Sequence, residues 1–215
     1  KEFAEQFPSG TPIQMLQVGV TGMNAQDGEW QSQIGGGQVG LRLSSTDSGR
    51  VLHLQQRGFT LSHMAPYSKW EEFVLEAQSY WAKFVEVCSP EAATRSAVRF
   101  INKINVPGQS IELRDFFHLY PQIPEGIPQD VNGMLLQLQM PQQDLGREVM
   151  AVINMGLGEP DRPNHIAVML DFDIFAVSEI EPKSDQLWVR LEQFRTRKNQ
   201  LFEACINDKV RELIA

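Results

Sequence analysis

The chain has 215 residues, of which 42% are apolar and 21% charged, so it is long enough to bury a core without disulfides or metals. Its formal net charge of −8 and its isoelectric point near 5.0 argue against a protein that mainly binds nucleic acid or an anionic membrane surface, because both need a positive field. We expect a single domain, or two closely packed halves.

The cysteines and the hydropathy of the chain bear on the cellular compartment in which we expect the protein. Cys88 and Cys205 each lie among apolar residues of a helical pattern, which predicts two buried free thiols and no disulfide. No apolar run reaches the roughly 18 residues that span a bilayer, and no basic-then-apolar leader is seen. We therefore expect a soluble cytoplasmic protein. Because the chain opens at Lys1 without Met, in the helix-like stretch 1–7, we also expect an upstream start and a first strand ahead of Lys1.

The first part of the chain predicts a β-meander followed by a helix. After a polar, glycine-rich region, alternation predicts strands at 39–44, 50–55 and 59–63, separated by short turns. Pro66 ends this sheet and Ser68 is expected to cap a helix over 68–88. The aromatic and aliphatic stripe of that helix indicates a face packed on a sheet. It comprises Trp70, Phe73, Val74, Ala77, Trp81, Phe84 and Val85.

The second part repeats this order. A long strand over 96–106 ends at Pro107-Gly108, and a short helix near 113–117 precedes a loop with three prolines. That loop is either a hinge between halves or a surface connection. Strands are then predicted at 131–140, 148–155 and 165–177. A last helix, capped by Ser184 and Asp185, is predicted over 184–214.

Together these elements predict an α+β fold. We expect two antiparallel meanders that join into one strongly twisted sheet, with both long helices on one face. The order of elements also suggests two similar halves, 1–107 and 108–215.

Familiar catalytic and metal signatures are missing from the sequence. The run Gly35-Gly36-Gly37 has no Lys-Ser/Thr after it and leads into a strand, so we interpret it as a loop or bulge and not a phosphate-binding loop. The four histidines are scattered without metal-ligand spacing. No nucleophile elbow or Cys/His signature is present. We expect neither a metal nor a cofactor.

The stretch Leu170-Asp171-Phe172-Asp173 places two carboxylates on one side of a predicted strand, opposite its apolar residues. A cross-strand ion pair with a strand cation such as Arg57, Arg99 or Lys103 explains them without any ligand. The alternative is a pair that holds a divalent cation or acts as acid and base, which needs a further oxygen ligand or a group that shifts a pKa. We favour the ion pair.

Five blocks of the sequence follow one another in a recognisable order: Arg57-Gly58-Phe59-Thr60-Leu61, Pro66 to Phe73, Val98 to Ile104, Leu170-Asp171-Phe172-Asp173 and Phe202 to Arg211. These blocks resemble a sporadically distributed family of uncharacterised prokaryotic proteins. They occur in the family's order over most of the chain. Phe100 stands where the family has tyrosine and Asn207 where it has threonine, which puts any role of those hydroxyls in doubt. The resemblance implies a fold, with a proline-containing strand ahead of the first helix, and no activity.

The ending Phe202-x-x-x-Ile206-x-Asp208-x-x-Arg211 also looks similar to bacterial export chaperones that hold unfolded preproteins. We therefore expect a non-enzymatic protein that binds a protein or peptide partner, within a bacterial stress, toxin-control or defence system. A homodimer is also expected, since an open sheet leaves edges to protect. The alternative is an enzyme that acts on a small or nucleotide-like ligand through strand carboxylates and arginines. The candidate ligand-binding residues are Arg57, Tyr67, Arg99, Asn102, Asp171 and Asp173.

Overall fold

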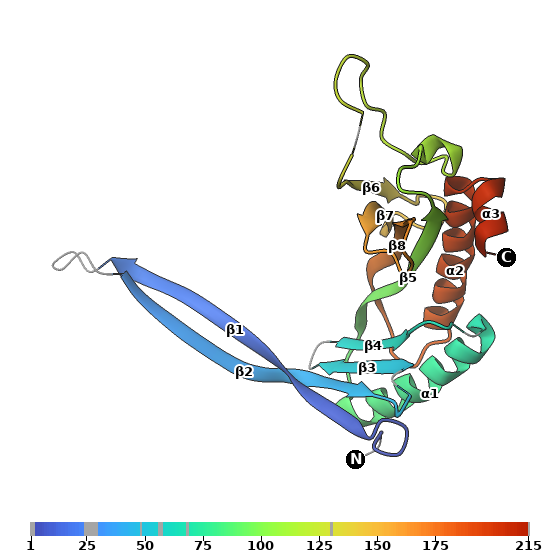
Figure 1. Ribbon diagram of the computed structural model, residues 1–215. Helices are drawn as coiled ribbons and strands as arrows, with labels where there is room; N and C mark the ends of the chain where they lie inside the picture. Colours follow the sequence, from blue (N-terminus) through green and yellow to red (C-terminus); the bar gives the residue numbers. More distant parts are fainter. Residues whose placement is uncertain are drawn as a thin grey trace. The chain divides into compact units, whose positions relative to one another are not determined.

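The computed structural model describes residues 3–23, 30–47, 49–55, 58–67, 69–129 and 131–214 (Figure 1). The chain forms two compact units, Lys1–Pro90 and Glu91–Ala215. The boundary lies ahead of the expected one at 107/108, because the strand β5 (Ala93–Pro107) pairs with β8 (His165–Ile180) of the second unit. The proline-containing loop is a connection inside the second unit and not a hinge between the units.

The first unit is a meander in which each strand pairs with the next along the chain. Its elements are β1 (Ser9–Met23), β2 (Trp30–Ser44), β3 (Arg50–Gln55), β4 (Gly58–His63) and the helix α1 (Trp70–Cys88). The glycine-rich region, predicted as loop, is part of a long β1–β2 ribbon in which Gly35, Gly36 and Gly37 are paired residues. The prediction failed because glycine has no side chain to show period-two alternation, whereas its backbone can still join a ladder. A register shift does occur nearby, at Ile13/Gln14.

The core of the first unit joins α1 to the sheet and to the first residues of the chain. Leu52 of β3 is fully buried. Phe3 and Phe7 lie in one helical turn, closed by the bond from Phe7 N–H to Phe3 C=O, and both rings meet Tyr80 of α1 edge-on. The predicted amphipathic helix is therefore present, and it begins at Trp70 with Lys69 as its capping residue. Ser68, the expected cap, is outside the described residues.

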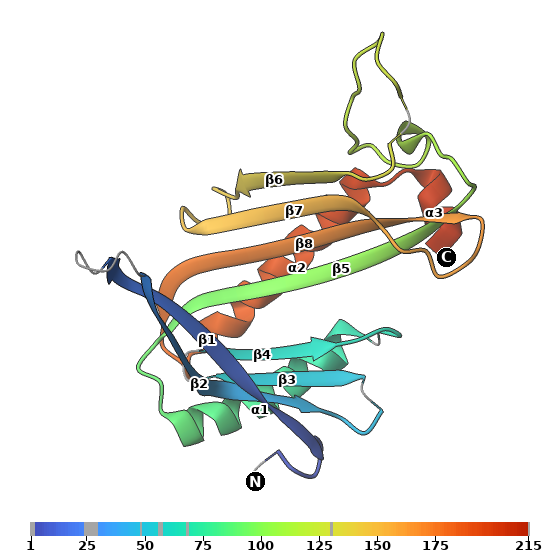
Figure 2. The same ribbon diagram turned by 60° about the vertical axis from the view of Figure 1, so that its left-hand side comes forward.

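The second unit is not a simple meander. Its sheet has the order β5-β8-β7-β6, where β6 is Leu135–Pro141 and β7 is Val149–Gly158, so the first strand lies beside the last (Figure 2). A turn of 3-10 helix at Leu113–Asp115 precedes the loop to β6. The helix α2 (Gln186–Cys205) lies across one face of the sheet, behind it in Figure 2, and contacts β5 and β8.

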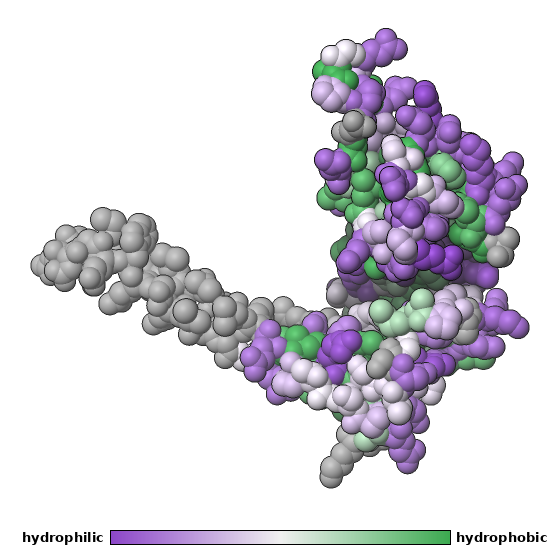
Figure 3. Space-filling model, viewed as in Figure 1, coloured by the Kyte–Doolittle hydropathy of each residue, from purple (hydrophilic) through white to green (hydrophobic). Residues whose placement is uncertain are grey.

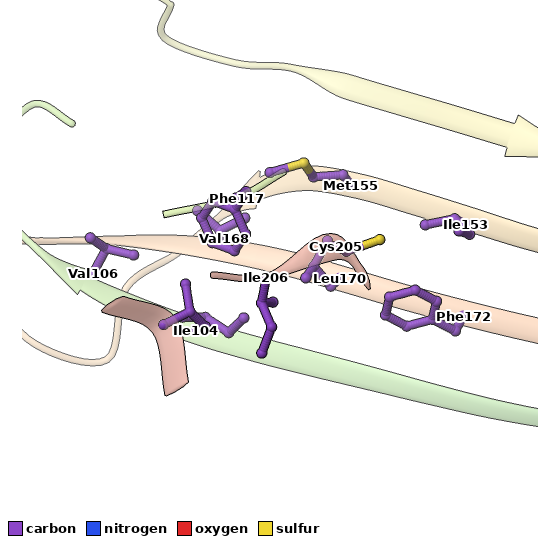
Figure 4. Close-up of a cluster of buried hydrophobic side chains, with 11 residues drawn as sticks. Ile104, Val106, Phe117, Ile153, Met155, Val168, Leu170, Phe172, Cys205 and Ile206 are labelled. Atoms are coloured by element: carbon purple, nitrogen blue, oxygen red, sulfur yellow. The ribbon is translucent and has the colours of Figure 1, made fainter. Parts of the chain in front are cut away.

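Alternate residues of the strands form the core of the second unit (Figure 4). On β8 the side chains of Leu170, Phe172 and Ile174 are fully buried, and the ring of Phe202 on α2 meets Phe172 edge-on at 6.1 Å between centroids. Burying one such side chain stabilises the fold by about 1.5–3 kcal/mol. The period-two prediction for this strand is confirmed.

The predicted last helix is two helices. α2 ends at Cys205 and α3 (Asp208–Ile214) follows, because residue 206 is drawn into a β-bridge with Phe117. The N–H of His118 donates to the carbonyl of Cys205, which would otherwise be left unpaired at a helix end. Asn207 then caps α3, its side-chain oxygen accepting from the N–H of Val210 at 3.4 Å.

The predicted α+β fold with antiparallel strands and two long helices is confirmed, although the strands form two hydrogen-bonded sheets and not one. The strands predicted at 131–140, 148–155 and 165–177 correspond to β6, β7 and β8. Cys205 is buried as predicted, but Cys88, at the end of α1, is exposed, and both thiols are free. Within the described residues, neither long helix is apolar over enough of its length to cross a bilayer.

Candidate functional site

The carboxylates of Asp171 and Asp173 lie on the face of the second sheet opposite α2. Strand pairing aligns four rows of residues on this face, which we call the open face because no helix within the described residues of the second unit lies on it (Figure 2). The two central rows are polar at most positions: Arg99, Asp173, Val152 and Gln139 form one, and Ile101, Asp171, Asn154 and Gln137 form the other.

Asp171 is held by a bidentate ion pair. Arg99 donates from Nε to Oδ1 at 2.8 Å and from Nη2 to Oδ2 at 2.6 Å, and Asn154 of β7 adds a bond from Nδ2 to Oδ2 at 3.2 Å. Asp171 is only 8% exposed, while the side chain of Arg99 is 57% exposed. Hydrogen bonding to Asp171 raises the pKa of Arg99 further. A buried carboxylate is tolerated here because both of its oxygens are paired.

Asp173 has a cation of its own. Arg95, which lies four residues before Arg99 on β5, donates from Nη2 to Oδ2 of Asp173 at 3.1 Å. The guanidinium of Arg95 also lies 4.5 Å from the centroid of the Phe175 ring, a cation–π distance. The cross-strand ion pairs predicted from the sequence are therefore present at both aspartates.

The hydrogen-bonded network continues on this face, across the strands to β6 and along β5. Asn154 accepts from Gln137 of β6 at 2.7 Å, so bonds run from β5 through β8 and β7 to β6. At the far end of β5, Lys103 pairs with Asp161 in the β7–β8 loop, and Asn105 donates to the same carboxylate at 2.9 Å. Hydrogen bonds from Lys103 and Asn105 lower the pKa of Asp161.

The other predicted site residues do not join this group. Asn102 lies on the α2 face, where its amide donates to the carbonyl of Leu170 at 3.1 Å, because it is an odd number of residues from Arg99 on a strand. Tyr67 belongs to the first unit and contacts the rings of His63 and Phe73. Arg57 is outside the described residues.

Sequence reasoning missed Arg95, Asn154 and Gln137. Arg95 has a signal, since a residue four positions before Arg99 faces the same side of a strand. Asn154 and Gln137 have none, because the register that sets Asn154 opposite Asp171 follows from the pairing of β7 with β8.

The ion pairs occupy the carboxylates of Asp171 and Asp173. Each carboxylate is paired with a guanidinium, so neither presents a free pair of oxygens to a cation. Among the described residues no three His, Cys, Asp or Glu side chains gather as metal ligands. A cavity of about 220 Å³ lies elsewhere, along α2 between Leu145 and Gln200, and includes none of the predicted site residues.

The block from Phe202 to Arg211 has a structural explanation. Ile206 is fully buried, and Asn207 donates from its amide to the carbonyl of Asp115 at 2.7 Å. Arg211 of α3 donates to Glu203 of α2 at 2.9 Å, which ties the two helices together, and also donates to Asp208 within α3 at 2.5 Å. Asn207 caps α3 through the bond that its side-chain oxygen accepts from the N–H of Val210.

Exposed apolar side chains lie within and beyond the two central rows of the open face. Ile101 of β5 is 59% exposed, Val177 of β8 62% and Leu135 of β6 78%. Figure 3 shows hydrophobic and hydrophilic residues mixed on the surface of the second unit. The open face thus combines an internally paired polar network with apolar groups in contact with solvent.

Comparison of the chain with protein-family models, with curated proteins and with solved structures finds no match.

Proposed function

We propose that the chain is a non-enzymatic binding protein that docks a partner protein on the open face of its second sheet. The observation that carries the proposal is the exposure of Ile101, Val177 and Leu135 on three different strands of one face. Apolar side chains that share a surface with paired polar groups are typical of protein interfaces.

The polar network supports the same proposal. A face whose charged groups already bind one another changes little when a partner arrives, so the partner meets a preformed surface. Arg99 is exposed on one side while it holds Asp171 on the other, and arginine is enriched at interfaces. The partner chemistry that fits is a protein surface or segment with apolar side chains and acceptors for guanidinium.

The alternative, an enzyme that uses Asp171 and Asp173 with strand arginines, needs these groups to converge on a ligand. Instead, Arg99 and Arg95 satisfy the two carboxylates across the sheet. No observation on this face favours a small-molecule reaction over protein binding. The family resemblance suggests a bacterial stress, toxin-control or defence system as the setting for the partner.

Site-specific photocrosslinking in the native host tests the proposal. A photoreactive residue at position 101 or 177 is expected to capture the same discrete protein, whereas one at the exposed Val189 on the outside of α2 captures none. Native mass spectrometry of the untreated protein then gives the stoichiometry. Absence of any adduct at 101 and 177, or one identical to that at 189, would overturn the proposal.

A further inference from the structure

The outermost strand β6 leaves one side of its backbone without a partner strand. In the order β5-β8-β7-β6 it pairs only with β7, and within the described ranges no other strand joins it. A strand at a sheet edge presents a row of N–H and C=O groups to any chain that can pair with it. β6 is seven residues long, Leu135–Pro141.

The register between β6 and β7 shows which backbone N–H and C=O groups of β6 point away from β7. Just after β6, the N–H of Gln142 donates to the carbonyl of Val149 at 2.9 Å, in the register that pairs β6 with β7. Residues directly opposite each other alternate between bonded and non-bonded pairs. Met140, Leu138 and Leu136 therefore bond to β7, while the remaining residues of β6 point their backbone groups away from it. These are Leu135, Gln137, Gln139 and Pro141.

Pro141 agrees with this assignment. Proline has no N–H, so within a sheet it is found where the N–H would face away from a neighbouring strand. Because Pro141 is one of the outward residues, its missing N–H removes no hydrogen bond between β6 and β7. The outward row consequently offers the N–H of Leu135, Gln137 and Gln139 and the carbonyls of all four residues.

The two edges of this sheet differ in charge. β5, at the opposite edge, carries Arg95, Arg99 and Lys103, and charged side chains are a common way to prevent edge-to-edge pairing. β6 has the sequence LLQLQMP and no charged residue. Nothing in its side chains repels a second uncharged strand.

We propose that β6 is a dimerisation edge, at which the β6 strands of two copies of this chain pair antiparallel and join their second-unit sheets into one. The sequence is self-complementary for this purpose. With Leu138 on the two-fold axis, Gln137 of one copy lies opposite Gln139 of the other, and Leu136 lies opposite Met140. Amides then meet amides on the open face and apolar side chains meet apolar ones on the helix face, as an isologous interface requires.

Backbone pairing follows from the same register. The outward N–H and C=O of Gln137 are aligned with those of Gln139 in the partner copy, and the N–H of Leu135 is aligned with the carbonyl of Pro141. The missing N–H of Pro141 therefore falls at the end of the paired stretch, where its loss is least costly. The dimer uses the strand edge, and it stands independently of the partner proposed for the open face.

Sedimentation velocity of the full chain tests the proposal, with Gln139→Pro as the disruptive variant and Gln139→Ala as its matched control. Gln139→Pro removes one outward N–H and leaves the bonds to β7, so we expect a folded monomer. Gln139→Ala keeps that N–H and is expected to remain a dimer. The double variant Gln137→Lys/Gln139→Lys, which sets like charges around the axis, is also expected to be monomeric, with an unchanged circular dichroism spectrum.

Amide hydrogen exchange provides the residue-level readout. In the unsubstituted dimer, exchange of the Gln137 amide is expected to be at least about tenfold slower than in the monomeric Gln139→Pro variant, whereas the Leu138 amide, bonded to β7 in both, keeps its rate. A monomeric unsubstituted chain, or a dimer that Gln139→Pro leaves intact, would overturn the proposal. Protection of Gln137 that appears only when an unfolded peptide is added would assign the edge to a peptide and equally overturn it.

Discussion

Asp171 and Phe172 are neighbours on β8, and each is at least nine-tenths buried, yet they are buried by different means. Phe172 lies under α2 and is fully buried among apolar side chains. Asp171 lies on the open face and is covered by the guanidinium of Arg99 and the amide of Asn154. One face is closed by a helix, and the other is closed locally by polar side chains that cross between strands.

The comparison shows that burial on the two faces has different energetics. On the helix face the stabilisation follows apolar area and packing. On the open face a polar group is tolerated only while its partners stay in place, because an unpaired buried carboxylate is costly. Substitutions on the two faces should therefore differ in size and in how they combine.

The largest effect is expected on the helix face. Phe172→Ala removes a fully buried ring and leaves a cavity beside Phe202, which should lower the free energy of unfolding by about 3–5 kcal/mol. Urea denaturation followed by circular dichroism measures this. Val177→Ala, at a position 62% exposed on the other face, is the control and should change stability by no more than about 0.5 kcal/mol. Similar losses for the two variants would refute the contrast.

An intermediate effect is expected from the ion pair. Arg99→Met leaves the carboxylate of Asp171 buried with only Asn154 as a partner, and should cost about 1–3 kcal/mol, less than a fully buried pair because Arg99 is exposed on one side. Combining it with Asp171→Asn removes the unpaired charge and keeps a group that can bond to Asn154. The double variant should therefore be more stable than Arg99→Met alone, and a double-mutant cycle in urea measures the coupling. Additive losses would show that the pair contributes nothing.

The smallest effect concerns a charge on the helix face. Lys198 of α2 lies with Nζ 3.8 Å from the centroid of the Phe100 ring, and burial, aided by the positive charge of Arg195, lowers the pKa of Lys198 to about 8. The ring favours the charged amine and burial disfavours it, and we expect burial to dominate. An NMR titration of isotopically labelled lysine side chains should show a midpoint for Lys198 well below the ordinary 10.5. A midpoint at or above the ordinary value would mean that the ring dominates.

The same group predicts a pH dependence of stability. Between pH 8 and pH 10.5 the unfolded chain binds more protons at Lys198 than the folded chain does, so stability rises with pH across this window. Water reaches part of the amine, which limits the gain to less than about 1 kcal/mol. Burial raises the pKa of Cys205 from 9.0 to about 11, which acts in the opposite direction above pH 9. The rise should therefore be clearest between pH 8 and pH 9 and absent from Lys198→Met.

Much of the fold follows from residue patterns because they are local. The alternation of Leu170, Phe172 and Ile174 predicted which side of β8 is core, and the stripe beginning at Trp70 predicted α1. The prediction failed where a non-local contact decides the structure. The helix predicted over 184–214 is interrupted because Phe117, far away in sequence, forms a bridge with Ile206, and no helical periodicity records such a contact.

The candidate site shows the same limit. Period-two geometry placed Asp171 and Asp173 together and indicated a strand cation beside them, and Arg99 and Arg95 occupy those places. The geometry could not show that Asn154 completes the coordination of Asp171, because that depends on the register of β7. Asn102 was also a candidate ligand-binding residue, although strand parity assigns its side chain to the opposite face.

The position of β5 beside β8 has a consequence for synthesis on the ribosome. In the first unit every strand can pair with the one made just before it, whereas β5 is made first in its sheet and must wait for the last strand, β8, more than fifty residues later. Closing that long interval is entropically costly and delays folding until most of the second unit has emerged. Until β8 is made, the β5 segment has no strand to pair with, and we expect the charges of Arg95, Arg99 and Lys103 to disfavour its association with other nascent chains. The cations that bind Asp173, Asp171 and Asp161 in the folded chain are thus expected to protect the β5 segment before β8 is made.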